Sequence, residues 1–158
     1  MPVPLRGFVR SLGHRPWFAR VGRVVVPADR LVSRLTGGRV VALGLIPSLL
    51  LTTTGRRSGQ PRRTPLLGVP DGDGFIVIGS NWGGRRHPAW ALNLLAHPDA
   101  VVTRRGRSVP VRAHLLSGEE RARAWRLALA HWPAYDTYAE RARARDLHVF
   151  RLEPHTPP

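Results

Sequence analysis

The sequence predicts a mainly β (α+β) protein, a small antiparallel barrel with helices at its periphery. Three observations support this fold class. Turn signals at residues 71–74 and 105–106 each separate two short apolar segments, as in β-hairpins. A short helical segment lies between the two hairpins, at residues 89–96. A last strand-like segment follows the C-terminal helices, at residues 147–152.

The predicted strands are short runs of apolar and β-branched residues. They are residues 49–53, 63–69, 75–78, 101–103, 109–115 and 147–152. The run at 75–78 is almost continuously apolar, so we expect it to be a central strand of the sheet.

The predicted helices are recognised by their ends. The helix between the hairpins begins next to Pro88, which suits a first helical turn, and ends before Pro98. A second helix follows a capping-box pattern, in which Ser117 is the N-cap and Glu120 its reciprocal partner. Its apolar face is expected to consist of Ala122, Trp125, Leu129 and Trp132.

The length of 158 residues predicts one domain with a single core. We expect a basic amphipathic extension over residues 1–40, a sheet domain over 41–154 and a tail over 155–158. The extension is compatible with packing on the domain and with docking on an anionic membrane surface. The longest apolar run is shorter than the roughly 20 residues of a spanning helix, and the N-terminus lacks a clear signal-peptide cleavage site.

The charge of the chain is strongly basic. There are 25 basic residues against 10 acidic ones, and every basic residue is Arg. Because Arg grips phosphates and carboxylates with forked donors, a net charge of +15 predicts an anionic partner. That partner is a nucleic acid, a membrane surface or an anionic cofactor. A GC-rich coding bias explains the exposed arginines equally well, so charge alone does not choose.

Several classes of site are disfavoured by the composition. The absence of Cys excludes disulfides, thiolate metal sites and Cys nucleophiles, and it fits a reducing cytoplasm. The histidines lack ligand spacing, so we expect no metal site. Ser58 has no Gly-x-Ser-x-Gly context and acidic residues are sparse, which disfavours hydrolysis. Cofactor chemistry stays open, because a cofactor carries its own reactive atoms.

Residues 53–66 are the most informative stretch. Gly55 and Gly59 allow the backbone to turn tightly and to approach a ligand. Ser58 and Thr64 add hydroxyl groups. Four arginines lie within eight residues, and they are Arg56, Arg57, Arg62 and Arg63. The pattern predicts an anion-binding loop without a Walker motif, and the alternative is a solvated basic hairpin tip.

Two further stretches suit a flat ligand. Residues 79–93 begin where a strand ends, and Trp90 and Asn93 share a helix face, so Trp90 provides either an aromatic wall or core packing. After Pro133, a helix carrying Tyr135 and Tyr138 is expected to reach residue 145. The two tyrosines project the same way, so they either line an apolar pocket or pack in the core.

Together, these three stretches resemble the deazaflavin-dependent nitroreductase family over residues 49–154. The matching segments are residues 54–66, Ser80-Asn81, 87–90, Asn93-Leu94, 117–123, Tyr135, Tyr138 and 152–154. The resemblance implies a split β-barrel that binds coenzyme F420, with FMN as the alternative cofactor. The tail of F420 carries a phosphate and several glutamates, so it would give the arginine cluster a polyanionic target.

The resemblance also implies roles for individual residues. Those that would hold the phosphate are Arg56, Arg57, Ser58 and Gly59, with Arg62 and Arg63 near the tail. Those around the ring would be Thr64, Pro65, Leu66, Ser80 and Asn81, supported by Trp90 and Asn93. Tyr135 and Tyr138 would form the acceptor pocket as catalytic residues, and Trp132 stands where the family often has Tyr.

The resulting hypothesis is hydride transfer from reduced F420 to an electron-poor acceptor such as a quinone or nitro compound. Tyr135, Tyr138 or solvent would deliver the proton. The alternatives are an FMN-binding split-barrel oxidoreductase and a non-enzymatic protein that binds nucleic acid or a membrane surface. We expect a cytoplasmic protein with no specific nucleic-acid partner. A peripheral membrane contact through residues 1–40 and a homodimer are further hypotheses.

Overall fold

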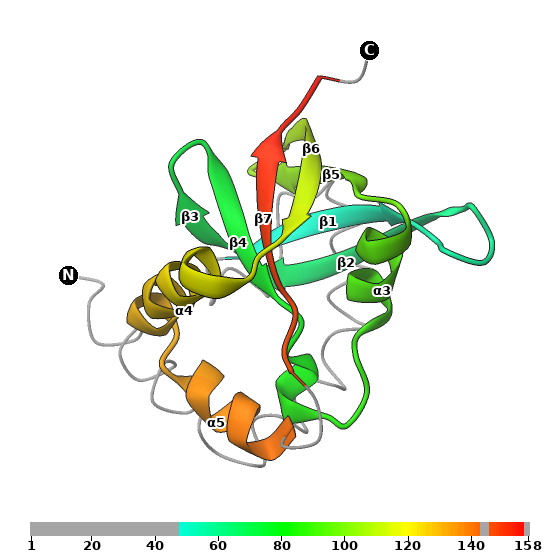
Figure 1. The fold of residues 1–158 in the computed structure, drawn as a ribbon. Helices are drawn as coiled ribbons and strands as arrows, with labels where there is room; N and C mark the ends of the chain where they lie inside the picture. The colour runs from blue at the N-terminus through cyan, green and yellow to red at the C-terminus, as the bar shows by residue number, and fades with distance from the viewer. Residues whose placement is uncertain (1–47, 143–145, 157–158) are drawn as a thin grey trace.

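The fold is an antiparallel sheet with helices around it (Figure 1). The computed structural model describes residues 48–142 and 146–156. Its elements are β1 (Ser48–Thr54), β2 (Pro61–Leu67), β3 (Val69–Asp71), β4 (Gly74–Ile78), the 3-10 helix η2 (Asn81–Gly83), α3 (Ala89–Ala96), β5 (Asp99–Arg104), β6 (Arg107–Leu115), α4 (Gly118–His131), α5 (Ala134–Ala142) and β7 (Val149–Pro154). The predicted extension over residues 1–40 lies outside the described residues.

The seven strands of this part of the chain form one sheet in the order β2-β1-β5-β6-β7-β4-β3. All six pairings are antiparallel, and the sheet curls into an open half-barrel with β2 and β3 at its edges (Figure 1). Strand β4 is paired on both sides, as its apolar sequence predicts. The mainly β fold class and the split-barrel expectation are therefore confirmed.

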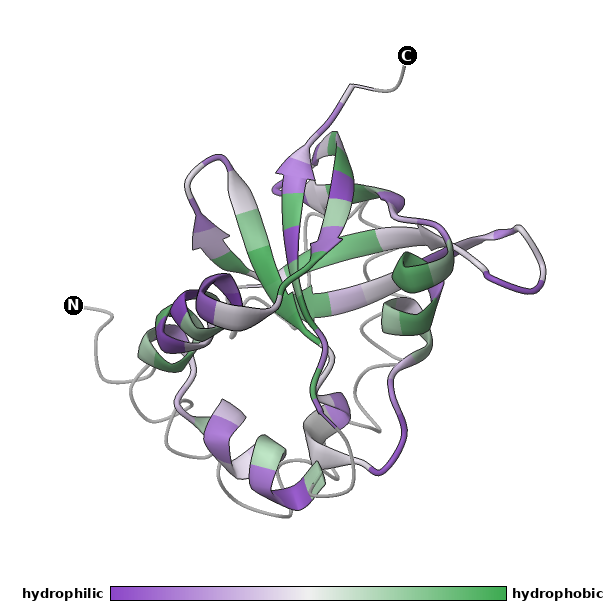
Figure 2. Cartoon of the chain, viewed as in Figure 1, coloured by the Kyte–Doolittle hydropathy of each residue, from purple (hydrophilic) through white to green (hydrophobic). Residues whose placement is uncertain are grey.

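Alternation along the strands divides the core between the two faces of the sheet. In β4, Val77 packs with Trp90 of α3 and with buried residues of the neighbouring strands, and these residues form the inner cluster. Ile76 and Ile78 pack on the other face of the sheet, in the outer cluster, which includes buried residues of α4 and α5. Figure 2 shows apolar residues where the strands cross, whereas polar residues lie at the hairpin tips and on the outside of α4.

The prediction of one strand over residues 63–69 is wrong. Strand β2 ends at Leu67 and β3 begins at Val69, and the two pair with different partners, β1 and β4. Gly68 lies at the break. A Cβ atom there would collide with the side chain of Leu49, so the chain passes closer to β1 than any other residue allows.

Both predicted hairpin turns are confirmed. Asp71 pairs with Gly74, and Arg104 pairs with Arg107. In the second turn, Arg105 and Gly106 have φ values of 51° and 77°. Positive φ at both central residues matches the right-handed twist of the strands, which is why this turn type dominates short hairpins.

The helices follow the prediction in place but not in every detail. Helix α3 spans Ala89–Ala96, as predicted. The capping box is wrong: Ser117 occupies the N-cap position, but its side chain makes no capping bond. The φ of Gly118 is +54°, far from the helical value. With this backbone, the Ser117 hydroxyl does not reach the main-chain amides of the first helical turn.

The buried face of α4 is also rotated from the prediction. Its centre is formed by Ala124 and Ala128, and Trp132 is buried at the C-cap, whereas Trp125 and Leu129 lie half-buried beside them. Helix α5 is described to Ala142, and its expected end at residue 145 lies outside the described residues.

An ion-pair network attaches α4 to the sheet. Arg123 of α4 donates two hydrogen bonds to Asp71, at 3.0 and 2.8 Å, and Arg151 of β7 donates a third at 3.1 Å. The hydrogen bonds from Arg123 are the main reason why the pKa of Asp71 lies below its ordinary value of 3.8. One carboxylate thus joins segments 52 and 80 residues away in sequence.

Asp71→Asn should lower the free energy of unfolding by about 1 kcal/mol, because it removes the charge that both arginines share. Since the folded pKa of Asp71 is depressed, its contribution is present above pH 3.8 and is lost as pH falls through the folded pKa. Thermal melts across pH measure this difference. Asp99→Asn, which breaks a single exposed pair with Arg112, is the control and should change little. Equal effects of the two substitutions would contradict the network.

Candidate functional site

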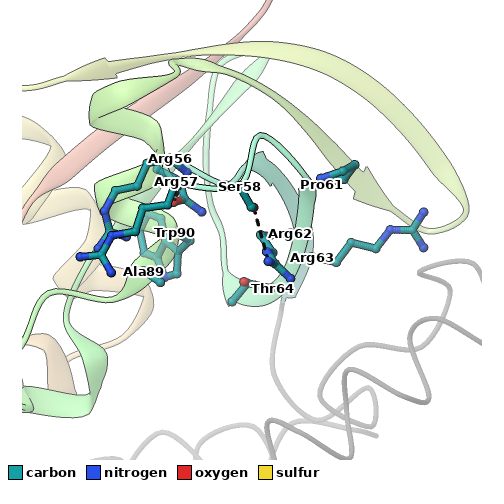
Figure 3. A pocket seen from close by; sticks show the side chains of 11 residues that line it. Arg56, Arg57, Ser58, Pro61, Arg62, Arg63, Thr64, Ala89 and Trp90 are labelled. Carbon is teal, nitrogen blue, oxygen red and sulfur yellow. Dashed lines mark hydrogen bonds between the residues drawn. The ribbon is translucent and has the colours of Figure 1, made fainter.

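A cleft of about 370 Å³ lies between the β1–β2 hairpin and the N-terminal end of α3 (Figure 3). Its volume is within the range of small-molecule sites. The residues that line it are Gly55, Arg56, Arg57, Ser58, Pro61, Arg62, Arg63, Thr64, Ala89, Trp90 and Asn93. The predicted anion-binding loop and the predicted helix face therefore meet in one place.

The loop between β1 and β2 is closed by its own backbone. The Gly55 N–H donates to the Gln60 carbonyl at 2.8 Å, and the Gly59 N–H donates to the Gly55 carbonyl at 2.8 Å. The Ser58 hydroxyl accepts from the Arg62 guanidinium at 3.4 Å, which joins the two sides of the loop. This bonding gives the arginine-rich segment a defined shape.

The two loop glycines are required for different reasons. A Cβ atom at Gly55 would lie 2.6 Å from the Ser58 hydroxyl oxygen and 3.1 Å from the Gln60 carbonyl oxygen. Gly59 has open space around it, but its φ of +66° is one that most side chains disfavour.

The cationic groups of the loop have no acidic partner in the described part of the chain. The four residues are Arg56, Arg57, Arg62 and Arg63. The carboxylates of Asp71, Asp99 and Glu153 pair with arginines elsewhere on the sheet and on α4. An unneutralised cluster of forked donors at a cleft is suited to an anion.

Helix α3 adds to this field. Ala89 and Trp90 begin the helix and line the cleft, and the preceding Pro88 provides no side-chain cap. The start of a helix carries a partial positive charge from its first amides, so it favours an anion in the same space.

Asn93 connects the helix to the loop. Its side chain is buried; its Oδ1 accepts from the Arg56 N–H at 3.1 Å, and its Nδ2 donates to the Thr53 hydroxyl at 3.1 Å. Both polar atoms of the Asn93 amide are therefore engaged within the protein.

Some of the predicted cofactor-binding residues line the cleft and others do not. Those that line the cleft are Arg56, Arg57, Ser58, Arg62, Arg63, Thr64, Trp90 and Asn93. Those that do not are Gly59, Pro65, Leu66, Ser80 and Asn81. In β2, the lining residues are the first four, Pro61 to Thr64, and the lining ends before Pro65. Figure 3 shows Arg62 beside Ser58, whereas the Arg63 side chain extends away from the other arginines.

Sequence reasoning missed Pro61 and Ala89 as lining residues. Each is the first residue of its element, β2 and α3. Their position at the start of these elements is the only signal in the sequence that points to them.

Ser80 and Asn81 lie in a second loop, at η2. Asn81 has a φ of 45°, and its side-chain amide donates to the Arg86 carbonyl at 3.0 Å. The Asn81 carbonyl accepts from Gly84 at 2.9 Å. These bonds hold the loop that leads into α3, and η2 packs against α5.

Tyr135 and Tyr138 are buried in the outer core cluster, away from the cleft lining. Their rings meet edge-on with centroids 6.1 Å apart. The Trp132 indole N–H donates to the Tyr138 hydroxyl oxygen at 3.4 Å. Burial raises the pKa of both phenols above the ordinary 10.0; for Tyr135 the neighbouring Tyr138 adds to this, and for Tyr138 the bond from Trp132 opposes it.

Comparison with known proteins identifies the family of this chain. A family model described as "F420H(2)-dependent quinone reductase" matches residues 26–154. The chain belongs to this family. An F420H(2)-dependent quinone reductase of Mycobacterium tuberculosis (Rv1261c) is 39% identical over 89 residues, which cover 54% of this chain and 60% of that protein. The chain thus spans about 60% of the length of the curated relatives it matches.

Solved structures agree with this family. "Structure of F420-H2 Dependent Reductase (FDR-A)" has a TM-score of 0.63 and 35% identity, covering 68% of this chain and 94% of that one. A structure described as a domain-swapped dimer has a TM-score of 0.65 and 31% identity, covering 80% and 99%. Vibrio cholerae HutZ, at 14% identity, 82% and 91% coverage and a TM-score of 0.54, shares the fold alone.

The described residues offer neither a membrane-spanning helix nor a cluster of metal ligands. No helix among them is long and apolar enough to cross a membrane. The same residues contain no group of three or more His, Asp or Glu side chains that could hold a metal ion.

Gly55→Ala should destabilise the protein by about 1–3 kcal/mol, because the new methyl group would force the loop apart at Ser58. Gly59→Asn should change stability by less than about 1 kcal/mol, because Asn tolerates positive φ and the space is open. Urea unfolding compares the two variants. If the two variants had equal stability, the loop would not be packed as described.

In the folded protein at pH 10.0, the two tyrosines, the only ones in the chain, should be less ionised than free tyrosine, which is half ionised at that pH. Because their folded pKa is raised, their contribution to stability is present below pH 10.0 and is lost as pH rises further. Phenolate absorbance, followed together with circular dichroism, should appear at a higher pH in folded than in denatured protein. Denatured protein is the control, and a phenolate signal with a midpoint near 10.0 in folded protein would refute the burial of both rings.

Proposed function

We propose that this chain is an oxidoreductase that binds reduced coenzyme F420 in the arginine-lined cleft and reduces a quinone. The observation that carries the proposal is the unneutralised arginine loop, which lines a cleft next to the start of α3. The names of the relatives, which are F420H(2)-dependent quinone reductases, support both the coenzyme and the acceptor class. A nitro compound is the alternative acceptor.

The donor set of the cleft fits the coenzyme. A tail with a phosphate and several carboxylates needs several forked donors and no competing acid, and the loop offers both. Arg56, Arg57 and Ser58 would hold the phosphate, and Arg62 the adjoining tail. Arg63 also lines the cleft but extends away from the other arginines, so it would hold a different part of the tail (Figure 3).

The ring would lie beyond Thr64. We assign it to the side where β2 continues to Pro65 and Leu66 and where Ser80 and Asn81 precede α3. When bound, the coenzyme would supply a hydride from its deazaflavin ring. Trp90 would form one wall of this region, since it packs in the inner cluster and also lines the cleft.

The role of the chain in the reduction is to hold a proton and to exclude water. A phenol is protonated near neutral pH, and burial raises the pKa of Tyr135 and Tyr138 further above 10.0, so they can donate a hydrogen bond or a proton but do not act as bases. Trp132 donates to the Tyr138 oxygen, so it orients that hydroxyl group. We therefore propose the two tyrosines as the donors of the acceptor pocket.

Two further parts of the proposal concern partners. A homodimer is supported by the domain-swapped dimer among the similar structures. A peripheral membrane contact through residues 1–40 is supported by their basic amphipathic sequence alone.

Purified protein titrated with F420 and with FMN should bind F420 in preference. Replacing Arg56 and Arg57 together by Ala should weaken F420 binding by about 10- to 100-fold and flatten its salt dependence, since charged hydrogen bonds are lost. Fluorescence titration at several salt concentrations measures both effects.

Arg105→Ala is the matched control. It removes an exposed arginine from the β5–β6 turn, which lies at the opposite end of the sheet because β5 runs antiparallel to β1. This variant should bind F420 as the wild type does. Tight FMN binding without F420 binding would refute the cofactor assignment, and a steep salt-dependent affinity for generic duplex DNA would favour a nucleic-acid partner.

A further inference from the structure

We propose that Thr53 and Asn93 form a buried hydrogen-bonded pair that positions the arginine loop and thereby determines its affinity for anions, with Thr53 acting from outside the cleft lining. Thr53 has no role in the proposed function, and Asn93 enters it only as a support. The inference rests on the proposed function only in taking the F420 tail as the natural anion.

The main-chain amide of Arg56 determines which group donates in each of the two hydrogen bonds of Asn93. The Arg56 N–H can only donate, so the Asn93 atom that faces it at 3.1 Å must be the carbonyl oxygen. The Asn93 amide nitrogen then faces Thr53 and donates to the Thr53 hydroxyl oxygen at 3.1 Å. Thr53 is 1% exposed and Asn93 is 4% exposed, so water does not compete for these bonds.

The pair holds the loop at a point that its own backbone bonds leave open. Those bonds join Gly55 to Gln60 and Gly59 to Gly55. The Arg56 amide is the one tied to α3, through Asn93, across 37 residues of sequence. In the described part of the chain, the amides of Arg57 and Ser58 are then left without a partner, and both residues line the cleft. The pair therefore decides which amides face a ligand.

Loss of the Thr53 hydroxyl would leave the side-chain amide nitrogen of Asn93 without an acceptor in a buried site. A buried donor without a partner is costly, so α3 and the loop would shift apart until the donor finds one. Arg57 and Ser58 would move with the loop. The shift would weaken anion binding even though no group that touches the anion is altered.

The first test compares Thr53→Val with Thr53→Ser. Val matches Thr in shape but lacks the hydroxyl, whereas Ser retains it. We expect Thr53→Val to weaken binding of both F420 and inorganic pyrophosphate by about 3- to 10-fold, the value of one hydrogen bond. Thr53→Ser should bind both within about 2-fold of the wild type. Because geometry and not charge is altered, the loss should be the same at low and high salt.

Asn93→Asp provides a second variant that preserves the fold. An aspartate can accept from the Arg56 N–H, and the Thr53 hydroxyl can reverse to donate to it, so both bonds survive. The added charge lies directly behind the loop. Because the new carboxylate is buried, we expect a melting temperature below that of the wild type and, in the folded protein, weaker anion binding than in the wild type.

The outcomes separate the two proposals. Thr53→Val and Asn93→Asp variants that bind pyrophosphate as the wild type does would overturn the pair. So would a Thr53→Ser variant as weak as Thr53→Val, or a wild type that binds neither anion. A wild type that fails to bind F420, but binds pyrophosphate in a Thr53-dependent way, would refute the coenzyme and uphold the pair. If Thr53→Val does not fold, Thr53→Ala, which also lacks the hydroxyl group, takes its place in the comparison with Thr53→Ser.

Discussion

The register between β1 and β2 is the constraint on which the site depends. Thr53 lies opposite Arg62, and Leu51 lies opposite Thr64, so these four residues share one face of the sheet. That face meets α3, where Asn93 bonds Thr53 and Trp90 packs in the inner core. A slip of β2 by one residue would turn Arg62 and Thr64 to the opposite face of the sheet. The buried leucines of β1 thus hold the register that places the cationic residues.

Charge is distributed so that the acids serve the fold and the cleft stays basic. Asp71 joins α4, β3 and β7 through Arg123 and Arg151, and Asp99 pairs with Arg112 between two strands. With 25 arginines and 10 acids, most arginines cannot be paired, and those at the β1–β2 hairpin have no acidic partner among residues 48–142 and 146–156. Their mutual repulsion is a cost to the fold that an anionic ligand would remove, so binding and stability should be linked.

The aromatic cluster beyond α4 differs in character from the basic cleft. Tyr135 and Tyr138 contribute to the core and hold phenolic protons that burial keeps in place. Trp132 donates to the Tyr138 oxygen, because an indole N–H can only donate, and this bond orients the Tyr138 hydroxyl group.

The sequence by itself determined the local features of this protein: both hairpin turns, the extent of α3, and the glycines and arginines of the loop, because turn and helix-end chemistry is confined to a few neighbouring residues. Tertiary structure alone decided the break at Gly68, which results from contact with Leu49, and the failure of the capping box at Ser117. It also decided that Arg62 and Arg63 point different ways, and that Asn93 reaches Thr53 across 40 residues. These contacts follow from strand register and helix packing, which join segments distant in sequence and so leave no local pattern.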